Sequence, residues 1–431
     1  MSRRIAAAAG PLLVAALAAL AAPGAAQDLA IVGGTVHPVS GPPIENATVL
    51  VQNGRIVAVG ADVSVPAGAA RIDAAGRVVT PGLFDPASSV GLVEVDLVSQ
   101  TRDESATTAD DPIAAAFDPL DGLNPNSVLV PYLRTYGLTT TATRPTGGLI
   151  SGMGAVIDLA GHRAADMVAR PRAAMFASFD EGTFRQVGGA RGATALRLRE
   201  VLDDARFWQR NRGAFDRGES RDLAASRLDL EALQPVLDGR MPLVVEADRA
   251  SDILAVLRIA SEFGVRPVIL GGAEAWVVAG ELAAGGVPVI VKPLTSLPSA
   301  FERLGARFDN AALLAAAGVP VAIGVLDTHR SHAITQEAGN AVRHGLPWDA
   351  ALRAITLTPA EIYGVADRYG SIEPGKVANL VVWSGDPLEL STRAETVVIR
   401  GEVMPMTSRP HELFDRYRSL DDTPRPAFDV D

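Results

Sequence analysis

The middle of the chain alternates short apolar runs with helix-length segments, and this alternation restricts the possible fold more than any other feature of the sequence. Strand-like runs lie at residues 242–246, 267–270, 288–292 and 320–324, with helical patterns at about 251–263 and 274–284 between them. Repeated strand and helix units predict an α/β fold with a (β/α)8 TIM-type barrel. A doubly wound open sheet is the alternative, but no phosphate-binding glycine fingerprint supports it.

Both ends of the chain carry a different pattern, in which β-branched runs are separated by Gly, Pro and Asn-Gly turn signals. These runs lie near residues 29–32, 47–51 and 55–59, and again near 379–383 and 396–400. Neither end supplies enough strands to be stable alone. We therefore predict a composite β-sandwich domain from residues 27–80 and 370–408, a barrel from residues 81–369 and a C-terminal tail from residues 409–431.

The first 26 residues have the pattern of a cleavable signal peptide. Arg3 and Arg4 precede an apolar run that ends before Pro23, and Gly24 and Ala26 supply the small residues that a signal peptidase inspects. An uncleaved anchor is the alternative, although the run is short and Ala-rich for a spanning helix. We expect an exported protein with no membrane contact after cleavage. It would be periplasmic in a Gram-negative host and extracellular otherwise, by either Sec or twin-arginine export.

The composition excludes several classes of partner and site. There are 50 acidic and 39 basic residues, a net charge of -11, and no basic block that could neutralise a phosphate backbone. We therefore expect no nucleic-acid partner. Cysteine is absent, so a disulfide framework, a thiolate nucleophile and a zinc finger are all excluded.

Three segments carry a family resemblance. Residues 79–85 read Val-Thr-Pro-Gly-Leu-Phe-Asp and resemble the first barrel strand of the amidohydrolase superfamily. Residues 357–361 and 370–387 resemble that superfamily's closing helix and its return to the sandwich. The nearest members are the imidazolonepropionase-like and dihydroorotase-like enzymes. The resemblance implies a hydrolase of C–N bonds in non-peptide, cyclic amide-like substrates.

The chemistry of this family uses one or two divalent ions, which activate a water and polarise the carbonyl that it attacks. On the first strand, the two ligand histidines of the family correspond to Ala87 and Ser89. On the fifth strand the ligand histidine corresponds to Glu246, and on the sixth to Gly271. The resemblance therefore implies that most metal-ligand positions are substituted.

The resemblance implies two further groups at the metal site, a bridging lysine and an acid on the eighth strand. A carboxylated lysine bridge is excluded, because Lys292 and Lys376 are the only lysines and neither precedes the fifth strand. The acid of the eighth strand has Asp327 as its counterpart, which makes Asp327 the candidate catalytic residue.

The residues left at the expected barrel mouth are polar. We predict a cluster of Glu246, Asp248, Lys292, His329 and His332. In one interpretation, Glu246, Asp248, Asp327 and His329 hold one divalent ion such as Mg²⁺ or Ca²⁺ in a rebuilt site. In the other, no cofactor is bound, the acids are paired, and the Lys292 ammonium replaces the charge of the metal, because ionised carboxylates need a partner in a partly dry cavity. A Schiff-base role for Lys292 is a third possibility.

Two functions follow from these interpretations. The first is a relative that is catalytically degenerate for metal-dependent hydrolysis and binds a small-molecule ligand, an intact amidohydrolase homologue or a second copy of itself. The second is an active hydrolase with a rebuilt carboxylate-rich site. Metal content separates the two, because only the second requires a bound ion.

Overall fold

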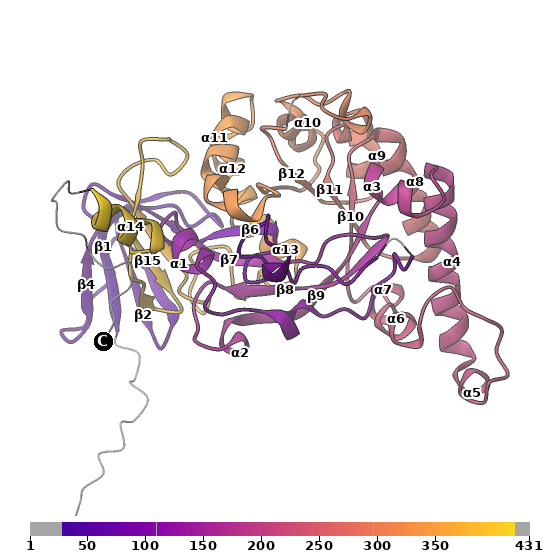
Figure 1. Ribbon diagram of the computed structural model, residues 1–431. Helices are drawn as coiled ribbons and strands as arrows, with labels where there is room; N and C mark the ends of the chain where they lie inside the picture. Colours follow the sequence, from indigo (N-terminus) through magenta and orange to yellow (C-terminus); the bar gives the residue numbers. More distant parts are fainter. Residues whose placement is uncertain (1–27, 109, 296, 419–431) are drawn as a thin grey trace, which may run out of the picture.

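The computed structural model describes residues 28–108, 110–295 and 297–418 (Figure 1). The predicted signal peptide of residues 1–26 lies outside these described residues. Within them, no helix is both long enough and apolar enough to cross a membrane.

The central sheet contains eight strands that pair in chain order. They are β6 (Leu83–Ser88), β7 (Leu138–Thr143), β8 (Ile150–Asp158), β9 (Val168–Ser178), β10 (Leu243–Ala247), β11 (Pro267–Gly271), β12 (Val289–Val291) and β13 (Val321–Ile323). The edge strands β6 and β13 contact each other, so the sheet nearly closes into a barrel. The predicted TIM-type fold is confirmed, and β10 to β13 take the fifth to eighth places in the barrel.

The third barrel strand departs from a regular strand–helix unit. β8 runs antiparallel to both β7 and β9, whereas the other neighbouring strands of this sheet are parallel. Only residues 144–149 join β7 to β8, and so short a link cannot hold the crossover that parallel strands need. The start of β8 therefore lies at the same edge of the barrel as the carboxyl ends of the other strands.

Helices cover the outside of the barrel (Figure 1). The longer ones are α4 (Arg191–Arg210), α8 (Ala250–Phe263), α10 (Asn310–Ala316), α11 (Ile334–Arg343) and α12 (Trp348–Ala354). The shorter ones are α1 (Leu129–Arg134), α2 (Ala164–Met167), α3 (Glu181–Gln186), α5 (Arg212–Asp216), α6 (Arg227–Ala232), α7 (Gln234–Leu237), α9 (Ala279–Ala284) and α13 (Leu357–Ile362). Helix α8 shows why they form: its buried residues recur at helical spacing, as at Ile253, Val256 and Ile259, and it ends at Gly264, whose φ of 63° suits glycine.

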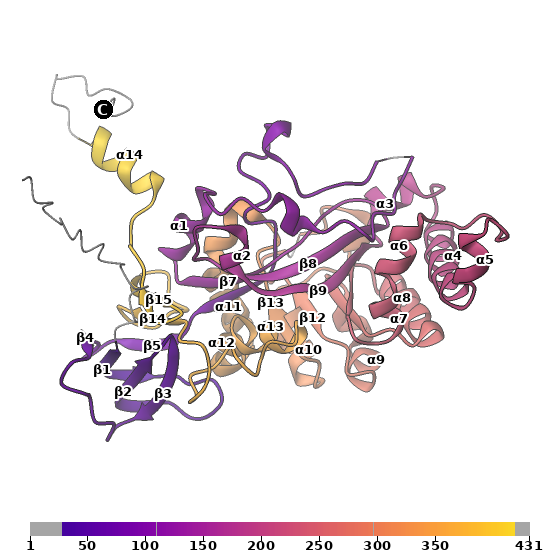
Figure 2. The ribbon, with the colours of Figure 1, turned by 90° about the horizontal axis from the view of Figure 1, so that it is seen from below.

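Both chain ends contribute to a second sheet, which lies beside the barrel (Figure 2). Its strands are β1 (Leu29–Val36), β2 (Ile44–Gln52), β3 (Arg55–Gly60), β4 (Ala70–Asp73), β5 (Val78–Pro81), β14 (Leu380–Trp383), β15 (Ala394–Ile399) and β16 (Glu402–Val403). Strand β5 pairs with β1 on one side and with β14 on the other, so it joins the two chain ends. The composite sheet is confirmed, while the domain limits stay a prediction. In the tail, α14 (Arg409–Tyr417) buries no residue.

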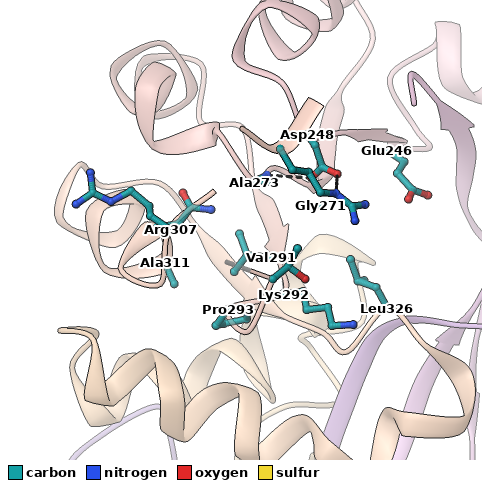
Figure 3. Close-up of a pocket in the computed structure, with 13 residues that line it drawn as sticks. Glu246, Asp248, Gly271, Ala273, Val291, Lys292, Pro293, Arg307, Ala311 and Leu326 are labelled. Carbon is teal, nitrogen blue, oxygen red and sulfur yellow. Dashed lines mark hydrogen bonds and ion pairs between the residues drawn. The ribbon is translucent and has the colours of Figure 1, made fainter. Parts of the chain in front are cut away.

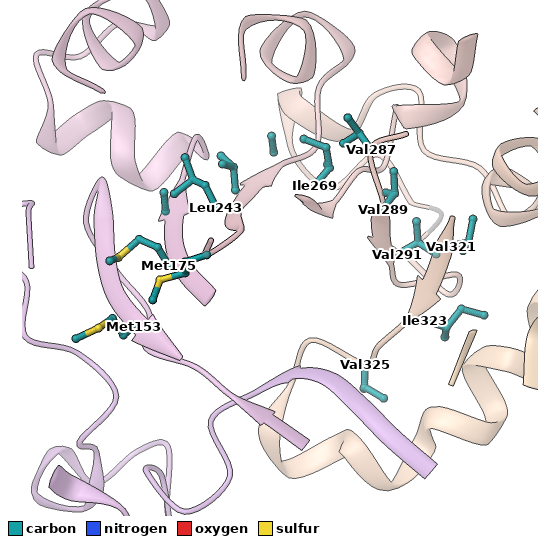
Figure 4. Close-up of a cluster of buried hydrophobic side chains, with 14 of the residues drawn as sticks. Met153, Met175, Leu243, Ile269, Val287, Val289, Val291, Val321, Ile323 and Val325 are labelled. Atoms are coloured by element: carbon teal, nitrogen blue, oxygen red, sulfur yellow. The ribbon is translucent and has the colours of Figure 1, made fainter. Parts of the chain in front are cut away.

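Strand alternation divides the barrel side chains into two layers and thereby positions the site. Figure 4 shows the layer that packs between strands and helices, which includes Val289 and Val291 of β12. Ile290 belongs instead to a second buried cluster on the inner face. The same alternation puts Val244 of β10 inside. Lys292 and Glu246, two residues farther along each strand, therefore face the barrel mouth.

A network of polar side chains around the buried Asp158 carboxylate links the second sheet to the barrel. The Asp158 side chain, at the end of β8, is fully buried and pairs with Arg400 Nε at 2.6 Å. It also accepts hydrogen bonds from Tyr369 Oη at 3.0 Å, Asn379 Nδ2 at 2.9 Å and Thr140 Oγ1 at 3.2 Å. The carboxylate is stabilised because charged and neutral donors surround it.

Candidate functional site

A polar cavity of about 130 Å³ opens at the carboxyl ends of β10, β11 and β12 (Figure 3). Its charged lining residues are Glu246, Asp248, Lys292, Arg303 and Arg307. Three of the residues predicted from sequence, Glu246, Asp248 and Lys292, therefore meet in one cavity. This edge of the barrel is where TIM-barrel proteins place their active sites.

Asp248 is held on both of its carboxylate oxygens. Arg303 Nε donates to Oδ2 over 2.6 Å, and the backbone N–H of Ala273 donates to Oδ1 over 3.0 Å. The Asp248 side chain is 6% exposed and that of Arg303 is 32% exposed. This carboxylate is therefore both neutralised and hydrogen-bonded without any ligand or metal.

Glu246 is held less tightly. Its Oε2 lies 3.5 Å from Arg144 Nη1, which is a long contact for an ion pair. Burial raises the pKa of Glu246, and the charge of Arg144 opposes that shift. Glu246 is thus the lining carboxylate with the weaker partner.

The Arg144 guanidinium places a positive charge in the barrel interior. It directly follows β7, its side chain is 12% exposed, and its guanidinium lies 5.9 Å from the centre of the Phe176 ring. Its charge also acts on Asp85 of β6, whose pKa is raised by complete burial and lowered in part by Ser331, the Ala87 N–H and Arg144. The guanidinium therefore sits within reach of acids from opposite sides of the barrel.

An amidohydrolase from Thermotoga maritima MSB8 has a solved structure that is 30% identical, covers 88% of this chain and 99% of its own, and superposes with a TM-score of 0.80. This chain belongs to the amidohydrolase superfamily. The amidohydrolase family model matches residues 249–404.

Two other relatives are more distant. Amidohydrolase tasK from Hapsidospora irregularis is 25% identical over 384 residues, which are 80% of this chain but only 39% of that relative. The chain thus spans about two fifths of the length of this curated relative. The structure of a molinate hydrolase is 20% identical, covers 94% of this chain and 99% of its own, and has a TM-score of 0.55. That likeness supports the fold alone.

Three positions that the resemblance matches to histidine ligands, Ala87 on β6, Ser89 directly after β6 and Gly271 on β11, have other structural roles here. Ala87 is 1% exposed and belongs to the inner apolar cluster. The Ser89 hydroxyl donates to the Arg144 carbonyl over 2.9 Å. Gly271 has a φ of 90°, and a Cβ atom there would lie 2.6 Å from Asp248 Oδ1. A side chain at position 271 would therefore displace Asp248.

The other residues predicted for the site are not brought to the cavity lining. Asp327 accepts a hydrogen bond from the Arg330 N–H and begins the 3₁₀ helix η5 (Thr328–Ala333). His329 Nε2 lies 2.9 Å from the Glu94 carbonyl, and its Nδ1 lies 3.2 Å from Asp96 Oδ2. His332 packs against the rings of Tyr132 and Tyr136. The His329 side chain therefore faces the loop after β6, and the His332 side chain faces α1 and the residues that follow it.

The donor set does not fit the divalent ion that the superfamily implies. Glu246 and Asp248 reach the cavity, but Asp327 and His329, the other two ligands of the rebuilt site, do not line it. Across residues 28–108, 110–295 and 297–418, no group of three or more His, Cys, Asp or Glu side chains is arranged to hold a metal ion. Two arginines already contact the carboxylates that remain.

Lys292 lines the cavity, but no ion pair to it is found within the described part of the chain. Its charge lowers the pKa of Glu337, although burial raises that pKa more strongly. The structure thus gives the counter-charge role predicted for Lys292 to Arg303 and Arg144. Sequence analysis missed both arginines. Arg144 was detectable because it directly follows a strand, whereas Arg303 ends the short 3₁₀ helix η4 (Phe301–Arg303), which has too few residues to show a periodic pattern.

We predict that Arg303 and Lys292 differ in their contribution to stability. Arg303→Met should lower the free energy of unfolding by about 2 kcal/mol, because it leaves the buried Asp248 carboxylate without its counter-charge, with a discount for the partial exposure of Arg303. Lys292→Met should change it by roughly 0.5 kcal/mol or less. Urea unfolding of both variants at neutral pH measures the difference. A large loss in Lys292→Met together with a small one in Arg303→Met would show that Lys292, and not Arg303, supplies the counter-charge.

Proposed function

We propose that this protein is a member of the amidohydrolase superfamily that does not catalyse metal-dependent hydrolysis and instead binds a small polar molecule at the barrel mouth. The observation that carries the proposal is the pairing of Asp248 with Arg303 at 2.6 Å and of Glu246 with Arg144 at 3.5 Å. Both carboxylates that reach the cavity therefore already have a protein cation beside them, closely at Asp248 and more distantly at Glu246. A divalent ion would have to displace these guanidinium groups, and breaking the pair of the buried Asp248 carboxylate with Arg303 is costly.

The alternative is an active hydrolase of C–N bonds, and membership of the superfamily favours it. Solved relatives of similar fold include a molinate hydrolase and a phenylurea hydrolase B. In this alternative Asp327 would have to leave its position at the start of η5 and turn toward the cavity. That movement would break the hydrogen bond by which the Asp327 side chain caps η5.

Location and partners are part of the same proposal. The pattern of residues 1–26 supports export. A small-molecule ligand is favoured by the size and polarity of the cavity, while an intact amidohydrolase homologue or a second copy of the chain are further candidate partners.

Addition of metal ions to the purified protein tests the proposal. Zn²⁺, Mn²⁺ or Mg²⁺ added in turn after chelator treatment should leave the thermal unfolding midpoint unchanged, because no set of ligands binds them in the folded state. A specific site would stabilise the protein by about 2.7 kcal/mol at one hundred times its Kd. A saturable stabilisation that is lost in Asp248→Asn and kept in Asp367→Asn, which alters an exposed acid, would contradict the proposal and favour the hydrolase.

A further inference from the structure

We propose that the cavity binds a zwitterionic, amino-acid-like molecule, whose carboxylate lies against Lys292 and Arg303 and whose ammonium lies against Glu246. The inference deepens the proposed function and rests on it, because it requires that no metal ion occupies the cavity. Lys292, which directly follows β12, and Glu246 of β10 both line the cavity (Figure 3).

The cationic side of the cavity has unused donors. Lys292 has no ion pair within the described residues, and the nearby Glu337 carboxylate already accepts a hydrogen bond from the Leu294 N–H over 2.7 Å. Arg303 uses Nε for Asp248, and no hydrogen bond from its two terminal nitrogens is found in the described part of the chain. A ligand carboxylate could therefore accept hydrogen bonds from both side chains. Such charge-assisted bonds are stronger than those between neutral groups.

Arg307 does not belong to this cationic group. Its guanidinium is paired with Asp309, donating from Nη2 over 2.6 Å, and lies 4.7 Å from the centre of the Trp276 ring. Its charge is therefore already compensated at the rim. Its role in the cavity is to form the wall.

The anionic side consists of Glu246. Asp248 is satisfied by Arg303 and the Ala273 N–H, whereas Glu246 has only the long contact to Arg144. A ligand ammonium would supply the closer partner that its charged form lacks.

Charge balance selects a zwitterion over other small ligands. Asp248 is paired closely with Arg303, and Arg307 with Asp309, whereas Glu246 lies 3.5 Å from Arg144 and no ion pair to Lys292 is found among the described residues. Lys292 and Glu246 are therefore the charged lining residues without a close partner. A dianion would be repelled by Glu246, and a dication by Lys292. The cavity volume of about 130 Å³ also restricts the ligand to a small molecule.

Titration calorimetry with charge-matched probes tests this inference. The probes are the ω-amino acids from glycine to 6-aminohexanoate, which sample the charge separation, together with pentanoate and pentylamine, which each carry one of the two charges. At least one ω-amino acid should bind saturably, and the singly charged probes should bind at least about tenfold weaker. Lys292→Met and Glu246→Gln should each weaken zwitterion binding by about tenfold or more. Lys376→Gln, which alters the other lysine, should leave it unchanged.

Three outcomes would overturn the inference. Binding of pentanoate as tight as that of the best ω-amino acid would remove the role of Glu246, and equally tight pentylamine binding would remove that of Lys292. Absence of binding by every zwitterion would reject the ligand class. If metal-free protein binds none of the probes and no metal, only this inference fails. If zwitterions bind only after a stoichiometric metal is added, the proposed function fails as well.

Discussion

A chain cut after Tyr369 is expected to aggregate instead of folding cooperatively. The cut removes β14, β15 and β16, so β5 loses its partner on one side and becomes an exposed sheet edge. The core of the second sheet also loses the buried side chains of Leu380, Val382 and Val398. The remaining N-terminal strands can no longer bury their apolar face.

Size-exclusion chromatography and urea unfolding of the truncated chain measure this effect. A control chain that ends after Ser408 removes α14, which buries no residue, and should unfold at nearly the same urea concentration as the full chain. The prediction fails if the chain cut after Tyr369 purifies as a monomer with a cooperative unfolding transition.

Arg400→Met is expected to lower the free energy of unfolding by about 3 kcal/mol, because it leaves the fully buried Asp158 carboxylate without its counter-charge, with a discount for the partial exposure of Arg400. Tyr369, Asn379 and Thr140 still donate hydrogen bonds, but none of them supplies a positive charge. The backbone adds little to the effect. Arg400 has a φ of 52°, and Met is strained there to a similar degree.

Chemical denaturation of Arg400→Met and of the double variant Asp158→Asn, Arg400→Met checks this result. The double variant should recover part of the loss, because it no longer buries an unpaired charge. A loss below about 1 kcal/mol in the single variant would show that the group between the barrel and the second sheet is not held by this charge pair.

Much of the fold could be predicted because apolar periodicity reports burial directly. The runs at 242–246 and 267–270 became β10 and β11, and the segment at 251–263 became α8. Periodicity does not report strand direction, so the antiparallel course of β8 was not predicted. The length of the link at 144–149 was the available signal for it.

The site could be predicted where a side chain lies on a strand, and not where it lies on a loop. Side chains alternate between the two faces along β10 and β12, and this alternation predicts that Glu246, Asp248 and Lys292, at or just after the strand ends, line the cavity. Asp327 and His329 follow β13 closely in sequence, but η5 turns His329 toward Glu94 and Asp96 of the loop after β6. Arg303 contacts Asp248 from the short 3₁₀ helix η4 between β12 and β13, a segment with no periodic pattern.

We propose that protein cations occupy the place of the metal at the barrel mouth. Elemental analysis of the mature protein, purified without chelators and dialysed, measures whether a metal ion is bound. The pairing of Asp248 with Arg303 and of Glu246 with Arg144 predicts well under about one equivalent of zinc or any other transition metal per chain. About one or two equivalents of a transition metal retained through dialysis would contradict the claim.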